Sequence, residues 1–393
     1  MRIKRLLLCV VLIAGCSIAL FAVDFGLILD QNAGFSGNGD ESAFEYSGIL
    51  VPRLSALLGE RGELFVSAGM QAGYQDDEWK FAPELLRTEI SARFGGGAIM
   101  AGRMYYSDPL GYISEGLFDG GRLSFDTAAA GTFGAGAWYT GFLYKNRANI
   151  AMTQAELEAA ALEVDLSDLE NSYFAPSRFV AALDWEHPSF LDVLMMNFAI
   201  LGQFDLSEGD LNSQYLVGSI ALPLRNFIFD LGGCLELIQD SGESGTAFSA
   251  DLGAVWALSA NQRLAFLARY TSGSSDSTEA FLPITTKSQG FVLKANHSGI
   301  TMLSLDYSGR LNRSASVGLS SSYFIRNDME TYANFGDEGN LLGNEFSGRL
   351  FWSPVSDLQF NLWAGIFLPS MGDVSPDAKS IWRVELSMIV SLF

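Results

Sequence analysis

Cysteine and histidine are scarce in this sequence. Of its three cysteines, Cys9 and Cys16 lie in the apolar N-terminal segment, so the rest of the chain holds Cys234 alone. A single thiol cannot form an intramolecular disulfide, and other interactions must stabilise the fold. The two histidines, His187 and His297, are not spaced as in an acyl-hydrolase triad or a metal site. We therefore expect no enzyme activity, no catalytic residue, no metal and no cofactor.

Positive charge is scarce as well, and long apolar runs are missing. The chain has 24 lysines and arginines against 45 aspartates and glutamates, which gives a net charge of −21. This acidic balance argues against a nucleic-acid partner, which requires a basic surface. After residue 22 no run approaches the roughly 20 apolar residues that a membrane helix requires. Because 49% of the residues are nevertheless hydrophobic, they must be distributed in another pattern.

The first 22 residues have the pattern of a secretory signal peptide. Three basic residues among the first five precede the apolar run LLLCVVLIAG, and small residues follow. We expect cleavage near Ala22, which leaves residues 23–393 as the mature domain. In the alternative, IAGC resembles a lipoprotein box with Cys16 as the acylated residue. The chain after Cys16 runs directly into a strand-like segment and not into a polar tether, which favours cleavage at Ala22.

After position 22 the apolar residues alternate with polar or small ones. In the stretch SDLQFNLWAGIFL, Leu358 and Phe360 lie on one face, and Gln359 and Asn361 lie on the other. This alternation predicts a strand with one apolar face. About 18 segments share the pattern: 23–31, 43–58, 62–74, 81–94, 97–106, 117–126, 130–144, 178–187, 192–205, 211–222, 225–238, 246–258, 261–272, 289–309, 313–327, 341–353, 356–369 and 380–393.

The connections between these segments alternate between short and long. Short ones such as GERG, HPSF and SANQ are followed by long polar ones such as QNAGFSGNGDES, QDDEWK, QDSGESG and SGSSDSTEAFLPITTK. A bacterial outer-membrane barrel has short periplasmic turns and long external loops, whereas a soluble sandwich has no reason to separate them. A soluble solenoid or propeller would show a fixed repeat period, which is missing. We predict an all-β fold, a transmembrane antiparallel β-barrel of about 18 strands (16–18).

Aromatic residues and the last residue agree with an outer-membrane location in a diderm bacterium. The predicted outer face contacts outer-membrane lipids, and barrels carry aromatic girdles at both interfaces. Candidates for these girdles lie beside the short connections at Trp185, Trp256 and Trp352, and beside the long ones at Tyr74 and Tyr270. The final Phe393 resembles the signal that the barrel assembly machinery recognises, so we expect this machinery as a partner during biogenesis.

A barrel of 16–18 strands encloses a water-filled lumen. The polar faces of the predicted strands carry charges of both signs, which suits a pore with a transverse field. Mutual pairing or simple solvation of the lumen is the alternative role for each of them. The candidate lumen residues on the strands are Arg87, Arg93, Asp251, Arg263, Arg269 and Arg349.

The segment AGRMYYSDPLGYISEGLFDGGRLSF contains a further cluster of charges, namely Arg103, Asp108, Glu115, Asp119 and Arg122. Here the chain resembles porins, in which the loop after the fifth strand folds inward and narrows the pore. The resemblance implies a constriction at 107–120. Replacing Arg103 or Arg122 by a neutral residue is then expected to shift the ion preference towards cations.

Over nearly the whole mature chain, the alternation of connections, the strand number and the pattern GR…D…G…DG are similar to the alginate-export and related substrate-specific porin families. The acidic loops of this chain differ from those of the alginate exporters. The resemblance therefore does not imply a polyanionic solute for this chain.

The connection 145–177 is long and acidic. Thr153 and Glu156 have the spacing of a capping box and are followed by good helix formers, which predicts a helix at 154–163. The segment could plug the lumen, or it could cap the external mouth and enrich cations there. An acidic, solvated external loop is the simplest alternative.

These observations favour a porin-like channel for the passive diffusion of small hydrophilic solutes. A closed or plugged surface barrel that acts as an adhesin or structural protein is the main alternative. A transporter for hydrophobic compounds is a second alternative, and it would carry an N-terminal plug before the first strand. No subunit interface can be read from the sequence, so the oligomeric state stays open.

Overall fold

The computed structural model describes residues 23–39, 41–75, 78–162, 164–165, 168–207, 209–275, 277–329, 331–336 and 339–392. The predicted signal peptide with Cys16, and the terminal Phe393, lie outside the described residues. Within the described ranges, none of the helices is long and apolar enough to cross a membrane.

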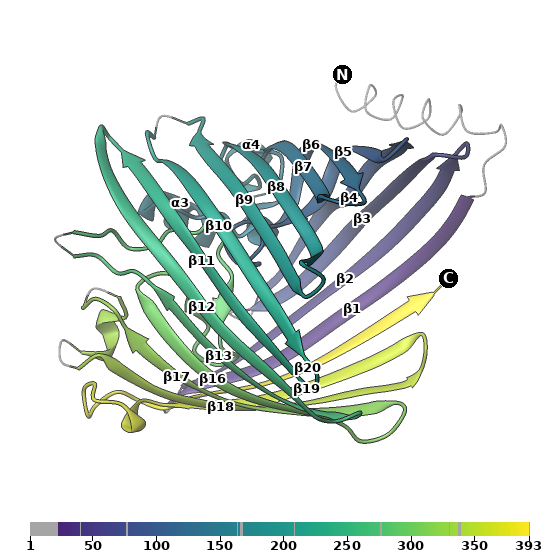
Figure 1. Cartoon of the computed structure of the whole chain (residues 1–393). Coiled ribbons are helices and arrows are strands. Elements are labelled where there is room, and N and C mark those ends of the chain that lie inside the picture. Colours follow the sequence, from purple (N-terminus) through teal and green to yellow (C-terminus); the bar gives the residue numbers. More distant parts are fainter. Residues whose placement is uncertain are drawn as a thin grey trace.

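The strands form a closed antiparallel barrel (Figure 1). Each strand of the 18-stranded sheet pairs with its neighbours in sequence, and β1 pairs with β20, which closes the sheet. Closure leaves no strand edge that would expose unpaired backbone groups to lipid. The predicted fold class is therefore confirmed. The strands are β1 (Val23–Asn38), β2 (Glu41–Leu58), β3 (Gly62–Gln75), β4 (Glu78–Phe94), β5 (Gly97–Ser107), β6 (Glu115–Thr127), β7 (Gly131–Tyr139), β8 (Arg178–Phe190), β9 (Leu194–Asp205), β10 (Asn212–Leu224), β11 (Phe227–Asp240), β12 (Glu243–Ser259), β13 (Gln262–Thr271), β16 (Ile300–Arg310), β17 (Ala315–Arg326), β18 (Leu341–Val355), β19 (Leu358–Leu368) and β20 (Ile381–Leu392).

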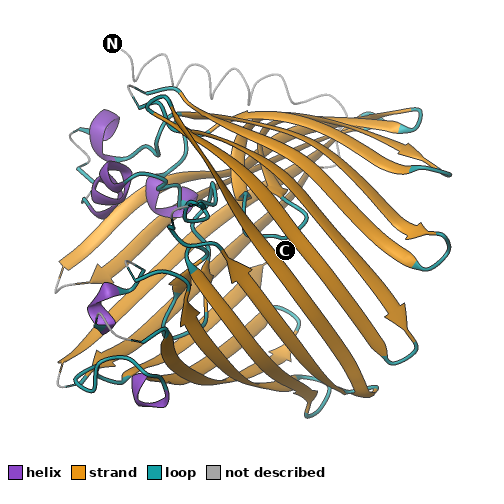
Figure 2. Ribbon diagram, turned by 60° about the vertical axis from the view of Figure 1, so that its left-hand side comes forward, coloured by secondary structure: helices purple, strands orange, loops and turns teal. Residues whose placement is uncertain are grey.

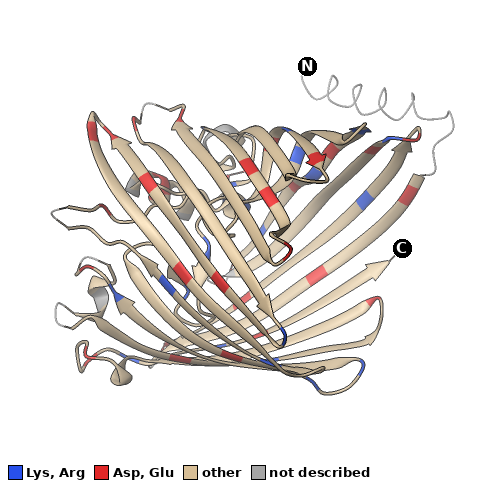
Figure 3. Ribbon diagram, in the orientation of Figure 1, with Lys and Arg blue, Asp and Glu red and all other residues tan. Residues whose placement is uncertain are grey.

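The outer face of the barrel is apolar because the alternation keeps the same register from strand to strand. Phe229 on β11 lies beside Ala254 on β12, which lies beside Phe266 on β13 and then Leu305 on β16. The large members of this row are exposed. Charged residues are sparse along the strands (Figure 3). Such a face suits contact with lipid tails.

Aromatic rings border this apolar face near both ends of the strands. Tyr74 and Trp79 lie 5.3 Å apart beside the connection of β3 and β4. At the opposite end, Trp185 stacks on Phe198 at 5.8 Å. Further ring pairs at that end are Phe227 with Trp256 and Trp352 with Phe360. The predicted positions of the two girdles thus agree with the geometry.

Several predicted boundaries are wrong. QNAGFSGNGDES, QDDEWK and QDSGESG belong largely to strands that continue past the predicted ends, so these connections are short. Their polar residues fit a strand because they lie at the ends of long strands, beyond the apolar part of the outer face. In the predicted segment 289–309 the barrel strand begins only at Ile300, and the predicted segment 130–144 ends as a strand at Tyr139.

Three long connections fold into the barrel (Figure 2). We name them L3 (108–114), L4 (140–177) and L7 (272–299). L4 contains α2 (Lys145–Ala148), α3 (Gln154–Ala161) and α4 (Leu169–Ser172), and L7 contains the small hairpin of β14 (Ser288–Gln289) and β15 (Ala295–Asn296). Short helices η1 (Ala333–Phe335) and η2 (Pro369–Met371) lie in the last two long connections. The helix predicted at 154–163 is confirmed as α3, including its capping box.

Candidate functional site

The tip of the hairpin formed by β5 and β6 leaves the barrel wall. The ladder between β4 and β5 ends at Thr88 and Arg103, and the ladder between β6 and β7 ends at Asp119 and Tyr139. β5 and β6 still pair with each other up to Ser107 and Glu115. The tip therefore leans into the lumen, and it carries L3 with it.

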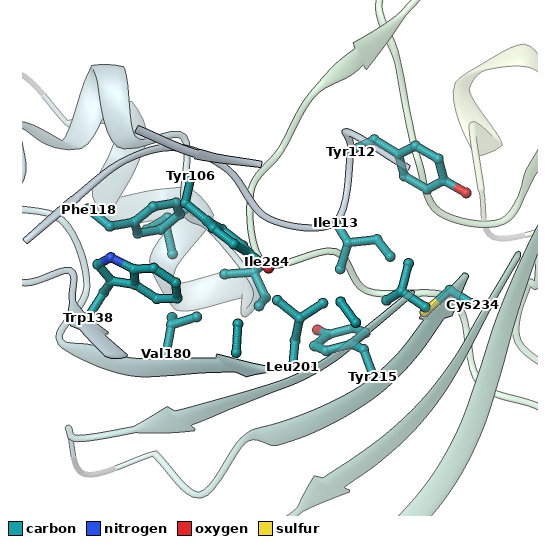
Figure 4. Packing of buried hydrophobic residues seen from close by; sticks show 14 of the residues in the cluster. Tyr106, Tyr112, Ile113, Phe118, Trp138, Val180, Leu201, Tyr215, Cys234 and Ile284 are labelled. Carbon is teal, nitrogen blue, oxygen red and sulfur yellow. The ribbon is translucent and has the colours of Figure 1, made fainter. Parts of the chain in front are cut away.

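A buried apolar cluster holds this tip against the inner wall (Figure 4). Tyr106 and Phe118 from the hairpin meet Trp138 on β7, with ring centroids 4.6 Å and 6.2 Å from that indole. Val180 and Leu201 on β8 and β9 complete the contact. The lumen of a barrel this wide would otherwise be filled with water. Part of it is instead a protein core.

Glycines make the bend possible. Gly102 on β5 has φ +119°, a conformation that L side chains rarely adopt, and a Cβ there would overlap the carbonyl oxygen of Thr88. Its register partner on β6 is Gly120, where a Cβ would overlap the carbonyl oxygen of Ala137. The hairpin leaves the wall next to this glycine pair.

Asp108 organises L3 itself. Its carboxylate accepts hydrogen bonds from the backbone N–H groups of Leu110 (2.7 Å), Ile113 (2.9 Å) and Ser114 (2.9 Å). Burial raises the pKa of this carboxyl group, and the backbone donors oppose that shift. Asp108 is therefore placed as a structural cap for the loop, and its charge is turned away from the ion path.

Tyr112 fastens L3 to the far wall. Its hydroxyl donates to Ser249 Oγ (2.9 Å) on β12, and its ring lies between Arg269 at 4.1 Å and His297 at 4.4 Å. Arg269 in turn forms a two-bonded ion pair with Asp251. Burial and two nearby cations lower the pKa of His297 to about 2, so this ring is neutral. Asp251 and Arg269 lie on the inner face of the wall, where they are paired and serve to hold the loop.

Arg103 and Asp119 lie on the opposite face of the hairpin from Arg122. The Arg103 guanidinium bonds both oxygens of Asp119 (2.8 and 2.6 Å), the carbonyl of Leu85 (2.5 Å) and that of Phe142 (2.9 Å). With L4 covering it, the Arg103 side chain is only 7% exposed. The two residues thus close the wall and do not line the constriction, which corrects the sequence-based assignment.

Arg103 and Asp119 take this position because β5 stops pairing with β4 beyond Thr88 and leaves the rest of that edge of β4 unpaired. From Leu85 to Glu78 this edge would expose backbone groups at membrane depth, where each unsatisfied group is costly. Arg103 donates to the carbonyl of Leu85, and the Tyr173 hydroxyl in L4 donates to the carbonyl of Pro83 (2.5 Å). Pro83 itself has no N–H to satisfy. Side chains and a proline therefore replace the missing strand.

L4 covers this unpaired edge of β4 from inside the barrel. Tyr144 forms a bridge with Phe174, so that the two ends of the loop lie side by side. Lys145 Nζ donates to the carbonyls of Ala159 and Leu162 (both 2.8 Å) at the end of α3. Arg178 at the start of β8 pairs with Glu156 (2.6 Å). L4 is thus a folded part of the wall and mouth, built on buried charges that the sequence did not single out.

L7 connects β13 to β16 and is bonded to the inner wall at β10 and β11. The Tyr215 hydroxyl donates to the carbonyl of Leu282 (2.7 Å), and the Glu236 carboxylate accepts from the N–H of Leu282 (2.9 Å). L7 then meets L3, where Lys287 bonds the carbonyl of Gly111 (2.9 Å) and pairs with Glu115. Glu115 is therefore part of the L3–L7 contact, and L3 and L7 act as one internal ridge.

Two cavities remain in the lumen. One of about 890 Å³ lies between L4 and the wall of β20 and β1–β4, and Glu45, Lys80 and Arg383 line it. The other, about 650 Å³, lies under L7 and is lined by Arg263, Asp306, Arg349 and Trp363 among others. Water and small solutes can occupy both spaces.

The charges beside the first cavity were missed from the sequence. Arg383 on β20 pairs with Glu45 on β2 (3.1 Å) and with Glu385 (3.3 Å). Their alternation with Val384 marks Arg383 and Glu385 as lumen-facing. The pairing of Arg383 with Glu45 has no sequence signal, because it depends on closure of the barrel between β20 and β1.

The remaining predicted residues face the lumen by register. Arg87 pairs with Glu89, Arg263 donates to Ser308 (2.7 Å), and Arg349 lies over the Trp363 ring at 5.5 Å. Arg93 is exposed near the end of β4. In the part of the chain that the structure describes, no group of three His, Cys, Asp or Glu residues could hold a metal ion.

Arg122 is the predicted constriction residue that the geometry keeps in the lumen. It pairs with Asp184 on β8 and lies 5.6 Å from the Tyr106 ring. Arg122→Gln leaves Asp184 unpaired, so we expect cation permeability relative to anions to rise up to about fivefold, since one charge at 4 Å in water contributes about 1 kcal/mol. Reversal potentials in a salt gradient measure this ratio. Arg122→Lys should leave it unchanged, and an unchanged ratio in Arg122→Gln would remove the pair from the ion path.

No protein-family model matches the chain, and no curated protein matches it in sequence. Solved structures match its fold. Pseudomonas aeruginosa OccK2 (OpdF) is similar with a TM-score of 0.66 at 12% identity, covering 94% of this chain and 97% of that one. A variant of OccD1 (OprD) is similar with a TM-score of 0.57 at 13% identity, covering 94% and 96%. These neighbours are outer-membrane porins, and the likeness establishes the closed 18-strand barrel.

Proposed function

We propose that this chain is an outer-membrane channel for the passive diffusion of small hydrophilic solutes. The observation that carries this proposal is the internal ridge of L3 and L7, together with two charged cavities in the lumen. A wall with charges of both signs favours hydrated solutes over apolar ones. In the proposal, residues 1–22 are a signal peptide that is removed near Ala22.

The similar structures support a solute of limited size. One of them, at a TM-score of 0.63, is a complex of OccK2 (OpdF) with glucuronate. A cavity of about 890 Å³ has room for a molecule of that size. The acidic balance of this chain, with 45 acidic against 24 basic residues, disfavours a polyanion such as alginate.

Single-channel recording of the refolded mature chain in a planar bilayer tests the proposal. We expect stable stepwise openings, and a decrease in ion current when glucose or glucuronate is added. A barrel that is folded by circular dichroism but never conducts would contradict the proposal. That result would favour the alternative in which L3, L4 and L7 plug the barrel and the external surface carries the function.

A further inference from the structure

The tip of L7 borders the smaller cavity of the lumen. Phe291 and Gly290 in the tip line this cavity of about 650 Å³. Lys294, three residues further on, has a left-handed backbone conformation with φ +51°. Burial and nearby Arg383 lower the pKa of Lys294, while Glu385 and Glu45 oppose that shift. Because Arg383, Glu385 and Glu45 line the larger cavity, the tip carries a cation within the electrostatic reach of that cavity.

One buried carboxylate binds the backbone of this tip. Glu345 on β18 is 2% exposed. Its Oε1 accepts from the N–H of Phe291 (2.7 Å), and its Oε2 accepts from the N–H groups of Val292 and Leu293 (both 2.9 Å). Hydrogen bonds to a charged acceptor are about twice as strong as neutral ones. The carboxylate therefore replaces the backbone partners that the turn cannot supply for itself.

The hairpin is short, and its side chains are packed as well. β14 and β15 share the pairs Ser288–Asn296 and Gln289–Ala295. Phe291, Val292 and Ala295 are buried in a second apolar cluster, where the Phe291 ring lies 4.8 Å from that of Trp363. The base of L7 is held separately, because Leu282 is bonded through both backbone groups to the wall. Loss of the Glu345 contact would therefore deprive the tip amides of their acceptor while the base of L7 stays in place.

We propose that Glu345 is a positioning residue of the channel, which sets the bore and the place of Lys294 by holding the backbone of the L7 tip beside the smaller cavity. This inference rests on the proposed function, because it concerns a loop that narrows the same lumen. L3 and the base of L7 support the tip that Glu345 positions. The amino-acid pattern around Glu345 does not predict this role, since its partners are backbone groups of a distant loop.

The test compares Glu345→Gln with Asp306→Asn. Both changes neutralise one lumen-facing carboxylate of the same cavity, but the bond shown for the Asp306 carboxylate is to Ser304 (2.6 Å) on its own strand. We expect Glu345→Gln to give noisier open channels of higher mean conductance, whereas Asp306→Asn should change only ion preference. Lys294→Gln should shift preference towards cations with quiet openings, and Lys294→Arg should restore the native preference. Equal effects of Glu345→Gln and Asp306→Asn would overturn the positioning role.

Hydrogen exchange provides a readout that does not require conduction. In Glu345→Gln we expect the amides of Phe291, Val292 and Leu293 to exchange roughly tenfold faster, while the Leu282 amide keeps its native rate as an internal control. Unchanged exchange at all three amides would overturn the proposal even if the wild-type channel conducts. If the wild type never conducts but the amides respond as expected, the contact between Glu345 and the L7 tip is supported and the proposed channel function is contradicted.

Discussion

Gly102→Val should prevent the β5–β6 hairpin from folding into the lumen. A β-branched residue at φ +119° is strained by about 1–3 kcal/mol, and its Cβ would also overlap the backbone of Thr88 on β4. We expect the free energy of unfolding to fall by more than the strain alone, as measured by urea titration in lipid vesicles. Among molecules that do fold, the conductance should rise because the L3 core has lost its place.

Gly95→Val is the matched control for this experiment. Gly95 also has a positive φ, +55°, but it lies in the short turn between β4 and β5 with nothing near its Cβ position. It should therefore lose only the stability that backbone strain explains, about 1–3 kcal/mol, and keep its native conductance. If the two variants behave alike, close packing at Gly102 does not direct the hairpin inward.

Arg103→Gln should destabilise the barrel and leave its ion preference unchanged. The guanidinium satisfies Asp119 and two carbonyl oxygens beside the free edge of β4, with its side chain 7% exposed. Removing one partner of such a buried pair costs about 3–5 kcal/mol, because the remaining carboxylate loses its counterion. Unfolding titrations measure the loss, and reversal potentials measure the ion preference. This expectation replaces the role in ion selection that the sequence suggested for Arg103.

Arg263→Gln serves as the comparison because it also removes one arginine from a strand. Arg263 is exposed in the lumen and donates to Ser308 (2.7 Å). Its loss should change stability by less than about 0.5 kcal/mol and should shift ion preference towards cations. A reversal potential that moves in Arg103→Gln with stability unchanged would place the Arg103 side chain in the pore.

The strands could be predicted well because each one carries its own evidence. The alternation of Leu358, Phe360 and Leu362 is sufficient to identify β19 and its outer face, whatever the rest of the chain does. Local evidence was misleading at the strand ends, where a run of polar residues wrongly predicted the end of a strand. Polar residues such as Gln31 and Asn32 continue β1, because the ladders to β2 and β20 continue through them.

The charged residues could be assigned to a face but not to a partner. Arg103 and Arg122 lie on the two strands of one hairpin, three register positions apart, and they were expected to share a role. The bend at Gly102 gives one of them to the lumen and the other to the wall. The partners of Glu236 and Glu345 were not predicted, because a lone acidic residue in a strand does not reveal that it binds a loop's backbone.

By itself the sequence determined an antiparallel barrel of about 18 strands with an apolar outer face, since alternation is a property of neighbouring residues. Only the tertiary structure decided how wide the path is and which charges border it. Those features depend on contacts between positions far apart, such as Tyr112 with Ser249 or Glu45 with Arg383, which are 137 and 338 positions apart. Such pairs meet only after the barrel has closed and its loops have folded inside it.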